Sequence, residues 1–262
     1  MLNLNLNLNL EILYMSFIIA IAGKGGTGKT TISSLLVSLL AKRKTGTVLG
    51  IDADPNSNLA ESLGLKTKDD IGTIVDFVAK NPASIPTGMT KDAYIDYRIQ
   101  TSIIEEDGFD LLAMGRPEGP GCYCFVNNLL RTLLKRLADD YDYIVIDNEA
   151  GFEHLSRRTM RRADRLLLVS DSSEAGLRAA KRIINLVKEL EIEVRKVYLL
   201  LNRCPQIFLK DKIEELGVEL IGVIPEDESL LSLSRQGKSI TQLNDSSLAV
   251  KELTVVLNKI LG

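Results

Sequence analysis

The sequence predicts an α/β fold in three layers: a twisted, mostly parallel sheet with helices on both faces and one antiparallel strand at its edge. Apolar runs of strand length alternate with helix-like stretches from residue 17 to the end of the chain, as in strand–helix–strand units. A glycine-rich turn, Gly23–Thr30, links the first apolar run directly to a helical stretch. Two short runs, 101–105 and 109–114, flank an Asp-Gly pair, which is the signal of an antiparallel hairpin.

The bulk composition is that of a globular protein. The chain has 262 residues, of which 45% are hydrophobic and 26% charged, and no Pro/Gly/Ser-rich linker divides it, so residues 15–262 are predicted to form a single domain. A formal net charge of −3 gives no general electrostatic case for nucleic-acid binding. No stretch is long enough to cross a bilayer. Three cysteines and no secretion signal predict a reducing, cytoplasmic location.

Residues 1–14 are predicted to be a weakly ordered extension without function. Their first ten positions alternate strictly between Leu and Asn after Met1, which could form a β-ribbon with one apolar face. They lack a basic start, a continuous apolar core and a cleavage site, so they are not a signal peptide. Met15 lies just before the first strand, where a natural start would fall.

A P-loop joins the first predicted strand, Phe17–Ala22, to a helical stretch that runs to Leu40. The residues between them, Gly23–Thr30, fit the pattern G-x-x-x-x-G-K-[S/T] in its required context of strand and helix. The glycines let successive N–H groups point at phosphate oxygens, and the helix N-terminus adds partial positive charge. Lys29 is expected to hold the β- and γ-phosphates, and the Thr30 hydroxyl to ligate Mg²⁺. The predicted nucleotide-binding residues here are Gly23, Lys24, Gly25, Gly26, Thr27, Gly28, Lys29, Thr30 and Thr31.

Two carboxylates, Asp52 and Asp54, follow the second predicted strand, Val48–Ile51. Two strands that flank one helix form a right-handed unit, and ligands bind at the carboxyl ends of such strands, so this turn should face the P-loop. Carboxylates two residues apart suit the organisation of Mg²⁺ and an attacking water. Pro55 and Asn56 are also what a plain turn would use.

The middle of the chain is less regular. Residues 64–97 are assigned no chemistry and are expected to form a flap beside the sheet, with a helix at 71–79 and a loop at 81–89. The two runs of the hairpin follow, and one of them should be antiparallel at an edge of the sheet.

The loop 115–124 is dense in Gly and Pro and contains Cys122 and Cys124; a helix is expected at 125–138. Residues two apart on an extended segment point to the same side, so both sulfurs can face one ion. A disulfide across one intervening residue would be strained. The alternative is that Cys122 and Cys124 are two free thiols that bind no metal ion. One chain supplies two of the four ligands of a closed soft-metal site, and a two-fold axis would supply the other pair.

The apolar run Tyr143–Asp147 ends in an acid, the Walker B form. Asp147 is expected to bind Mg²⁺ through water. Residues 148–151 are expected to form the segment called switch II in P-loop nucleotide hydrolases. The alternative is a buried strand that happens to end in a solvated carboxylate.

The second half of the chain alternates between strands and helices. Strands are predicted at 166–169 and 197–201 with a helix at 174–190 between them, and a last strand at 218–224. The final helix, 248–261, has an apolar face but only two cations. It is therefore predicted to pack against the protein rather than lie on a membrane.

Three further features are expected to have structural rather than functional roles. A basic run is predicted to be a solvated helix face or dimer contact rather than a nucleic-acid patch; its members are Arg157, Arg158, Arg161, Arg162 and Arg165. His154, the only histidine, is expected to be a polar residue at a helix start, with a role in metal transfer as the alternative. Cys204 is expected to be an inert, semi-buried thiol.

The loop sequence KGGTGKTT resembles the deviant Walker A loop of the SIMIBI-class ATPases, which include the nitrogenase iron protein and the partition and septum-site ATPases. In that class the extra lysine, here Lys24, reaches the partner's nucleotide, so the resemblance implies an ATP-hydrolysing homodimer. It also implies that Asp54 orients or deprotonates the attacking water and that Asp52 holds Mg²⁺, mostly through water. Asn202 would read adenine. The loop under the adenine would be Pro225, Glu226 and Asp227.

Within the class, two stretches resemble the CooC-type ATPases that assist nickel insertion into carbon monoxide dehydrogenase. They are GRPEGPGCYCFVNNLL from Gly115 and DNEAGFEHLSRRT from Asp147. The resemblance covers nearly the whole chain from Ser16. It implies a metallochaperone with an intersubunit site at Cys122 and Cys124, which would take Ni²⁺ or, in isolation, Zn²⁺. The implied partner is apo carbon monoxide dehydrogenase or a related nickel enzyme, with no nucleic acid or membrane.

Two alternatives remain at the level of the sequence. A positioning protein of the partition or septum-site type would need a basic patch or an anchor helix and has no use for paired thiols. An electron-transfer iron protein with a bridging [4Fe–4S] cluster would need a second cysteine near Asp147, which this chain does not offer.

Overall fold

The computed structural model describes residues 16–67, 69–116, 126, 129, 132–133, 136–150, 162–204 and 210–262. The predicted extension at residues 1–14 lies outside these ranges.

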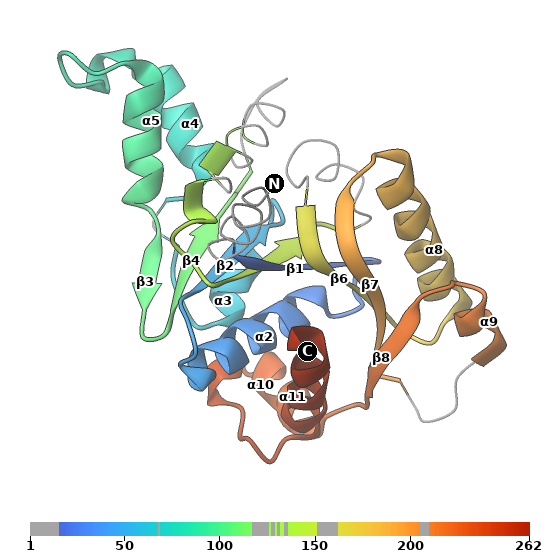
Figure 1. The fold of residues 1–262 in the computed structure, drawn as a ribbon. Coiled ribbons are helices and arrows are strands. Elements are labelled where there is room, and N and C mark those ends of the chain that lie inside the picture. Colours follow the sequence, from blue (N-terminus) through green and yellow to red (C-terminus); the bar gives the residue numbers. More distant parts are fainter. Residues whose placement is uncertain are drawn as a thin grey trace, which may run out of the picture.

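Eight strands of the described residues form one sheet in the order β3-β4-β2-β5-β1-β6-β7-β8 (Figure 1). All neighbouring strands are parallel except β3 and β4, so the predicted fold class, including the antiparallel edge, is confirmed. The bounds are β1 Phe17–Gly23, β2 Val48–Ala53, β3 Ile104–Glu106, β4 Phe109–Ala113, β5 Tyr143–Asn148, β6 Arg162–Ser170, β7 Glu193–Asn202 and β8 Glu219–Ile224.

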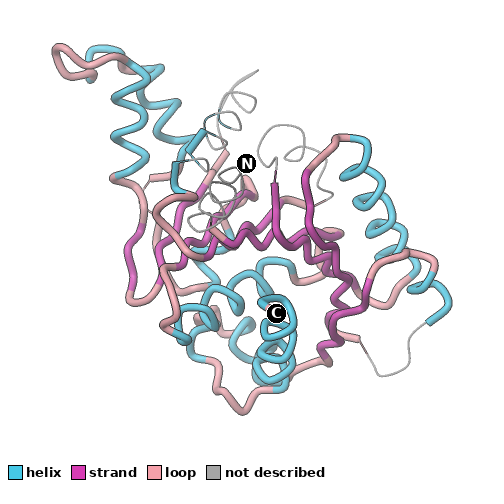
Figure 2. The backbone as a smooth tube through the Cα atoms, viewed as in Figure 1, coloured by secondary structure: helices cyan, strands magenta, loops and turns pink. Residues whose placement is uncertain are grey.

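The helices lie on both faces of this sheet (Figure 2). Successive residues of β1 point to opposite faces, so that Ile19 and Ile21 enter one apolar core while Ala20 and Ala22 enter the other. The first core also contains α2 and α11, and the second contains α4, α5 and α8. The helix bounds are α2 Lys29–Arg43, α3 Asn58–Ser62, α4 Ile71–Lys80, α5 Lys91–Gln100, α8 Glu174–Glu189, α9 Lys210–Glu214, α10 Glu228–Arg235 and α11 Leu248–Leu261, with short 3₁₀ turns at Pro82–Ser84 and Ile240–Gln242.

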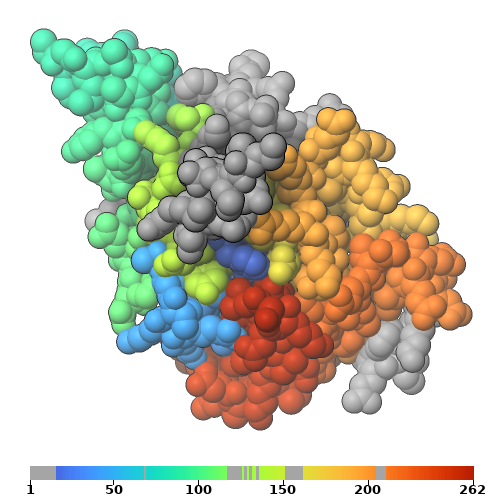
Figure 3. All heavy atoms as spheres, in the orientation of Figure 1, coloured from blue at the N-terminus to red at the C-terminus, as the bar shows by residue number. Residues whose placement is uncertain are grey.

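Helix α5 was not predicted, and together with α4 it projects from one end of the sheet (Figure 1) and forms the blue-green protrusion in Figure 3. The backbone N–H of Ala93 donates to the Thr90 hydroxyl at 3.2 Å, which starts the helix. Only Ile95 and Ile99 are buried in this helix, so its apolar stripe is too narrow to give a clear 3.6-residue period in the sequence. The predicted α4 is confirmed, and its first turn is capped by Asp70, which accepts from the Thr73 amide at 2.7 Å.

The final helix, α11, has the predicted bounds and packs as predicted. Its apolar residues Leu253, Val256 and Leu257 are buried against β8 and α2. Even its last cation is engaged, because the Lys259 ammonium donates to the Ile221 carbonyl at 3.1 Å. Among the described residues, no helix combines the length and the apolarity that a membrane span requires.

Truncating α11 on its buried face should destabilise the whole sheet. Leu253 is fully buried, so Leu253→Ala should lower the free energy of unfolding by about 3 kcal/mol, since it removes packed methyl groups and leaves a cavity. Chemical denaturation monitored by circular dichroism would measure this. On the same helix Val255 is half exposed, and Val255→Ala should cost less than about 0.5 kcal/mol. Equal losses in the two variants would contradict this packing.

Candidate active site

The glycine-rich turn lies between β1 and α2, at the carboxyl edge of the sheet. Gly23 has φ +156, and a Cβ there would lie 2.1 Å from the Val169 carbonyl oxygen. Gly28 has φ +90, and a Cβ there would lie 2.4 Å from Nδ2 of Asn202. The loop therefore needs glycine at both positions to approach β6 and the end of β7 so closely.

Lys29 is buried at the start of α2. Burial lowers the pKa of its ammonium, and the nearby carboxylates of Asp147, Asp54 and Glu149 oppose that shift. The structure thus brings together the P-loop lysine and the acids predicted at the ends of two different strands.

Asp52 and Asp147 are direct neighbours in the register of the parallel strands β2 and β5. Both are buried. Asp52 accepts hydrogen bonds from the amides of Leu59 at 2.7 Å and Asp54 at 3.1 Å. Burial, followed by the charge of Asp147, raises the pKa of Asp52 to about 8. Two like charges in one low-dielectric site disfavour the ionised form of both.

Asp147 is tied to the first turn of α2. It accepts from the Ser33 hydroxyl at 2.9 Å and from the Thr30 side chain. Burial raises its pKa to about 6, although the hydrogen bonds from Thr30 and Ser33 and the charge of Lys29 oppose the shift. Two desolvated carboxylates beside a threonine hydroxyl form a set of hard oxygen donors that fits Mg²⁺.

Asp54 lies in the site but is occupied by its own turn. Its carboxylate accepts from the backbone amide of Asn56 at 2.9 Å and from the Asn56 side chain at 2.8 Å. Ser57 follows with φ +51, an uncommon value for a residue with a side chain. The local hydrogen bonds of this segment are thus those of a plain turn, which was the alternative that the sequence offered. Asp54 nevertheless lies close enough to Lys29 to affect the pKa of that lysine.

The end of β7 contacts the P-loop through two consecutive residues. The Asn202 amide donates to the Thr27 carbonyl at 2.9 Å, so one of the donors predicted to read adenine is engaged by the loop. The Arg203 guanidinium donates to the Gly26 carbonyl. Arg203 belongs to none of the motifs predicted from the sequence; its only signal there is that it is a basic residue directly after Asn202.

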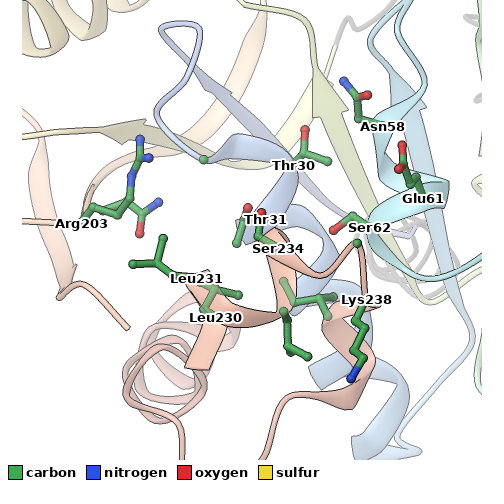
Figure 4. Close-up of a pocket in the computed structure, with 15 residues that line it drawn as sticks. Thr30, Thr31, Asn58, Glu61, Ser62, Arg203, Leu230, Leu231, Ser234 and Lys238 are labelled. Carbon is green, nitrogen blue, oxygen red and sulfur yellow. The ribbon is translucent and has the colours of Figure 1, made fainter. Parts of the chain in front are cut away.

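A pocket of about 330 Å³ opens beside these groups. Its walls are the start of α2, α3, the end of β7, α10 and the segment that follows α10 (Figure 4). Thr30 and Thr31 contribute the polar side of this pocket, while Leu230 and Leu231 contribute part of the apolar side. An apolar wall next to a phosphate-binding turn suits a nucleoside.

The predicted adenine loop, residues 225–227, does not line this pocket. Instead the Asp227 carboxylate joins two helices: it accepts from the Leu230 amide of α10 at 3.2 Å and from the Ala249 amide of α11 at 3.0 Å. Burial acts to raise the pKa of Asp227, but hydrogen bonds from Ser229, Ser247 and these amides lower it below its ordinary value. Binding of adenine by this loop stays a prediction.

The basic run is not a helix face where the structure describes it. Arg162 and Arg165 lie in β6, so the helix prediction is wrong for these two residues. Arg162 pairs with the buried carboxylate of Asp164, and Arg165 donates to the Ile260 carbonyl at 3.0 Å. Their guanidinium groups thus tie β6 to its surroundings.

Several predicted residues lie outside the described ranges, namely Cys122, Cys124, Gly151, His154, Arg157, Arg158 and Arg161. Within those ranges no group of three or more His, Cys, Asp or Glu side chains could hold a metal ion. Cys204, the remaining thiol, is buried.

Comparisons with known proteins agree with this geometry. Residues 18–240 match the CobQ/CobB/MinD/ParA nucleotide binding domain. An uncharacterized ATP-binding protein of Methanocaldococcus jannaschii is 41% identical over 94% of this chain and 98% of its own length. The carbon monoxide dehydrogenase accessory protein CooC of Rhodospirillum rubrum is 29% identical over 86% of this chain and 90% of its own length. The structure of the cell division protein MinD from Aquifex aeolicus superposes with a TM-score of 0.69 at 25% identity, covering 94% and 97% of the two chains.

The raised pKa values of Asp52 and Asp147 predict how stability depends on pH. In the folded protein these carboxyls keep their protons to about pH 8 and about pH 6, whereas the unfolded chain releases them near pH 4. The folded state therefore binds more protons between these limits, and stability should fall as the pH rises from 5 to 8. Urea midpoints of the metal- and nucleotide-free protein would measure this. Asp52→Asn should flatten the fall; a midpoint that rises over this interval would contradict the assignment.

Proposed function

The chain belongs to the CobQ/CobB/MinD/ParA nucleotide-binding family and is an ATPase, and we propose that it uses ATP hydrolysis to help insert nickel into carbon monoxide dehydrogenase or a related nickel enzyme. The observation that carries this proposal is the paired thiol in Gly121-Cys122-Tyr123-Cys124, because thiolates at this spacing bind soft metals and serve no purpose in positioning DNA or membranes. The accessory protein of R. rubrum supports it, since it aligns with most of the chain.

The arrangement of the P-loop supports a division of roles in hydrolysis. Lys29 would hold the β- and γ-phosphates at the start of α2, and Asp54 would orient the attacking water at the end of β2. Thr30, Asp52 and Asp147 would hold Mg²⁺, which supplies charge neutralisation on the phosphate oxygens when bound. Asp52 and Asp147 are buried and share one site, in which the charge of Asp147 raises the pKa of Asp52, so a divalent cation would favour the ionised form of both carboxyls.

Lys24 is proposed to act across a dimer interface. Its carbonyl accepts from the Thr27 hydroxyl at 2.9 Å, which fixes the backbone of the loop, while the residue itself is exposed on the surface. An exposed cation on a fixed backbone can reach a nucleotide on a second copy without rearranging its own loop. Two copies around one axis would also bring two Cys122–Cys124 pairs together.

A positioning ATPase of the septum-site or partition type is the second candidate, and the likeness to MinD of A. aeolicus favours it. The apolar face of α11 weighs against a membrane role for that helix, because it is buried against β8 and α2. Arg162 and Arg165, which the sequence offered as part of a basic patch, are engaged within the protein.

Lys24→Ala should block the ATP-dependent association of two chains. With ATP or a slowly hydrolysed analogue, the wild-type mass should shift from monomer to dimer, because Lys24 then contacts the partner's phosphates. Light scattering would measure the mass. Lys66→Ala, at another exposed lysine, should still dimerise. A wild-type mass that is the same with and without ATP would remove the proposed dimer.

The thiol pair should hold the metal. After purification without chelators, the wild-type dimer should contain about one nickel or zinc ion, and Cys122→Ser/Cys124→Ser should contain almost none, since the remaining ligands are too few. Elemental analysis would measure this. Cys204→Ala removes the buried third cysteine and should retain the ion.

The same variants test the client. Wild-type protein with ATP and Ni²⁺ should activate apo carbon monoxide dehydrogenase, whereas the double serine variant should not. Equal metal in the wild type and the double variant would overturn the site. Metal binding without activation, together with ATP-dependent binding to DNA or lipid vesicles, would favour the positioning ATPase.

A further inference from the structure

We propose that Arg203 is a positioning residue for phosphate binding, which fixes the P-loop by holding the Gly26 carbonyl. This inference concerns ATP binding alone and does not depend on nickel or on the client enzyme. Two consecutive residues at the end of β7 hold two consecutive carbonyls of the loop: Arg203 that of Gly26, and Asn202 that of Thr27 at 2.9 Å.

Because the peptide bond is planar, a donor that holds a carbonyl of the loop also sets the direction of the next N–H group. In a trans peptide the C=O and the following N–H point in opposite directions. A donor that holds the Thr27 carbonyl therefore turns the Gly28 amide away from β7, into the cradle that the loop forms. In the same way, a donor that holds the Gly26 carbonyl sets the direction of the Thr27 amide, which closes the turn by donating to the Lys24 carbonyl at 3.4 Å.

Beyond the turn that Thr27 closes onto Lys24, the loop gains from an external support because its glycines leave the backbone unusually free. Gly25, Gly26 and Gly28 have no side chains that could fix it, and a Cβ at Gly26 would meet nothing within 4 Å. Glycine loses more conformational freedom on ordering than any other residue. A loop that is already held in place therefore binds phosphate more tightly, because less freedom is lost on binding.

The Arg203 side chain is well placed to give this support. Asn202 and Cys204 on either side of it are buried, and the Cys204 amide donates to the Ile224 carbonyl of β8 at 3.2 Å. Arg203 itself adopts φ +53, a strained value for a residue with a Cβ, which surrounding structure must maintain. In Figure 4 its guanidinium lies at one side of the pocket, away from α3 and Lys238.

The test separates support of the loop from contact with the nucleoside. Arg203→Ala should raise the dissociation constants of both ATP and inorganic tripolyphosphate about tenfold, the loss expected for one charge-assisted hydrogen bond. Tripolyphosphate has no base or ribose, so it reports on the phosphate cradle. The KM for ATP should rise by a similar factor with little change in kcat. Arg203→Lys, which keeps a donor, should recover part of the affinity.

Two further variants exclude a merely structural effect. Arg203→Gly removes the guanidinium together with the strain at φ +53, so its thermal midpoint should be no lower than that of the wild type while its affinity for tripolyphosphate remains reduced. Arg165 makes the same kind of guanidinium–carbonyl bond near the amino end of β6, far from the carboxyl ends of the strands where the P-loop lies. Arg165→Ala should therefore leave the affinity for tripolyphosphate unchanged.

Three results would overturn the proposal. The first is unchanged affinity for tripolyphosphate in both Arg203→Ala and Arg203→Gly. The second is a weakening of ATP binding alone, which would assign Arg203 to the nucleoside. The third is an equal loss of tripolyphosphate affinity in Arg165→Ala, which would make the effect a general consequence of lowered stability.

Discussion

The placement of two acids at the same level of adjacent strands is the constraint on which this site depends. Asp52 and Asp147 are paired in register and buried, so water cannot solvate a charge on either carboxylate, and the pKa of each is raised. The protein meets the cost with backbone amides on Asp52, with the hydroxyl of Ser33 on Asp147 and with the ammonium of Lys29 nearby. These groups lie near the start of α2, in the turn after β2 and at the start of α3. Any change in the register between β2 and β5 would separate the two carboxylates and remove the electrostatic basis of the site.

Much of the fold could be predicted because its strands are buried on both faces. Apolar runs such as those of β2 and β5 are continuous, and the acids that end them mark the carboxyl edge where ligands bind. The bounds of α11 could be predicted because its apolar face is wide. Helix α5 has only two buried residues, and Arg162 and Arg165 lie in a strand whose first residues carry charge. In both places local periodicity was too weak to reveal the structure.

The topology predicts that the acids at the strand ends lie near Lys29, but it does not predict the individual contacts of the candidate site. Strand ends bring Lys29, Asp52, Asp54 and Asp147 together, and that much follows from topology. The engagement of Asn202 with the P-loop, the contact of Arg203 with Gly26, and the link that Asp227 makes between α10 and α11 do not follow. Each of these contacts depends on the direction of one side chain between elements that are far apart in the sequence. A single sequence does not show which residues make such contacts.

The distances along the chain between the P-loop and its supports bear on when the loop can form. The motif is encoded within the first thirty residues, yet its partners on β7 lie 175 and 177 positions later. Strand β1 likewise has neighbours only in β5 and β6, which begin at Tyr143 and Arg162. During synthesis the ribosome must therefore extend the chain past Arg203 before Asn202 and Arg203 can hold the loop. The nucleotide cradle is thus encoded first, but it can gain these two supports only late in synthesis.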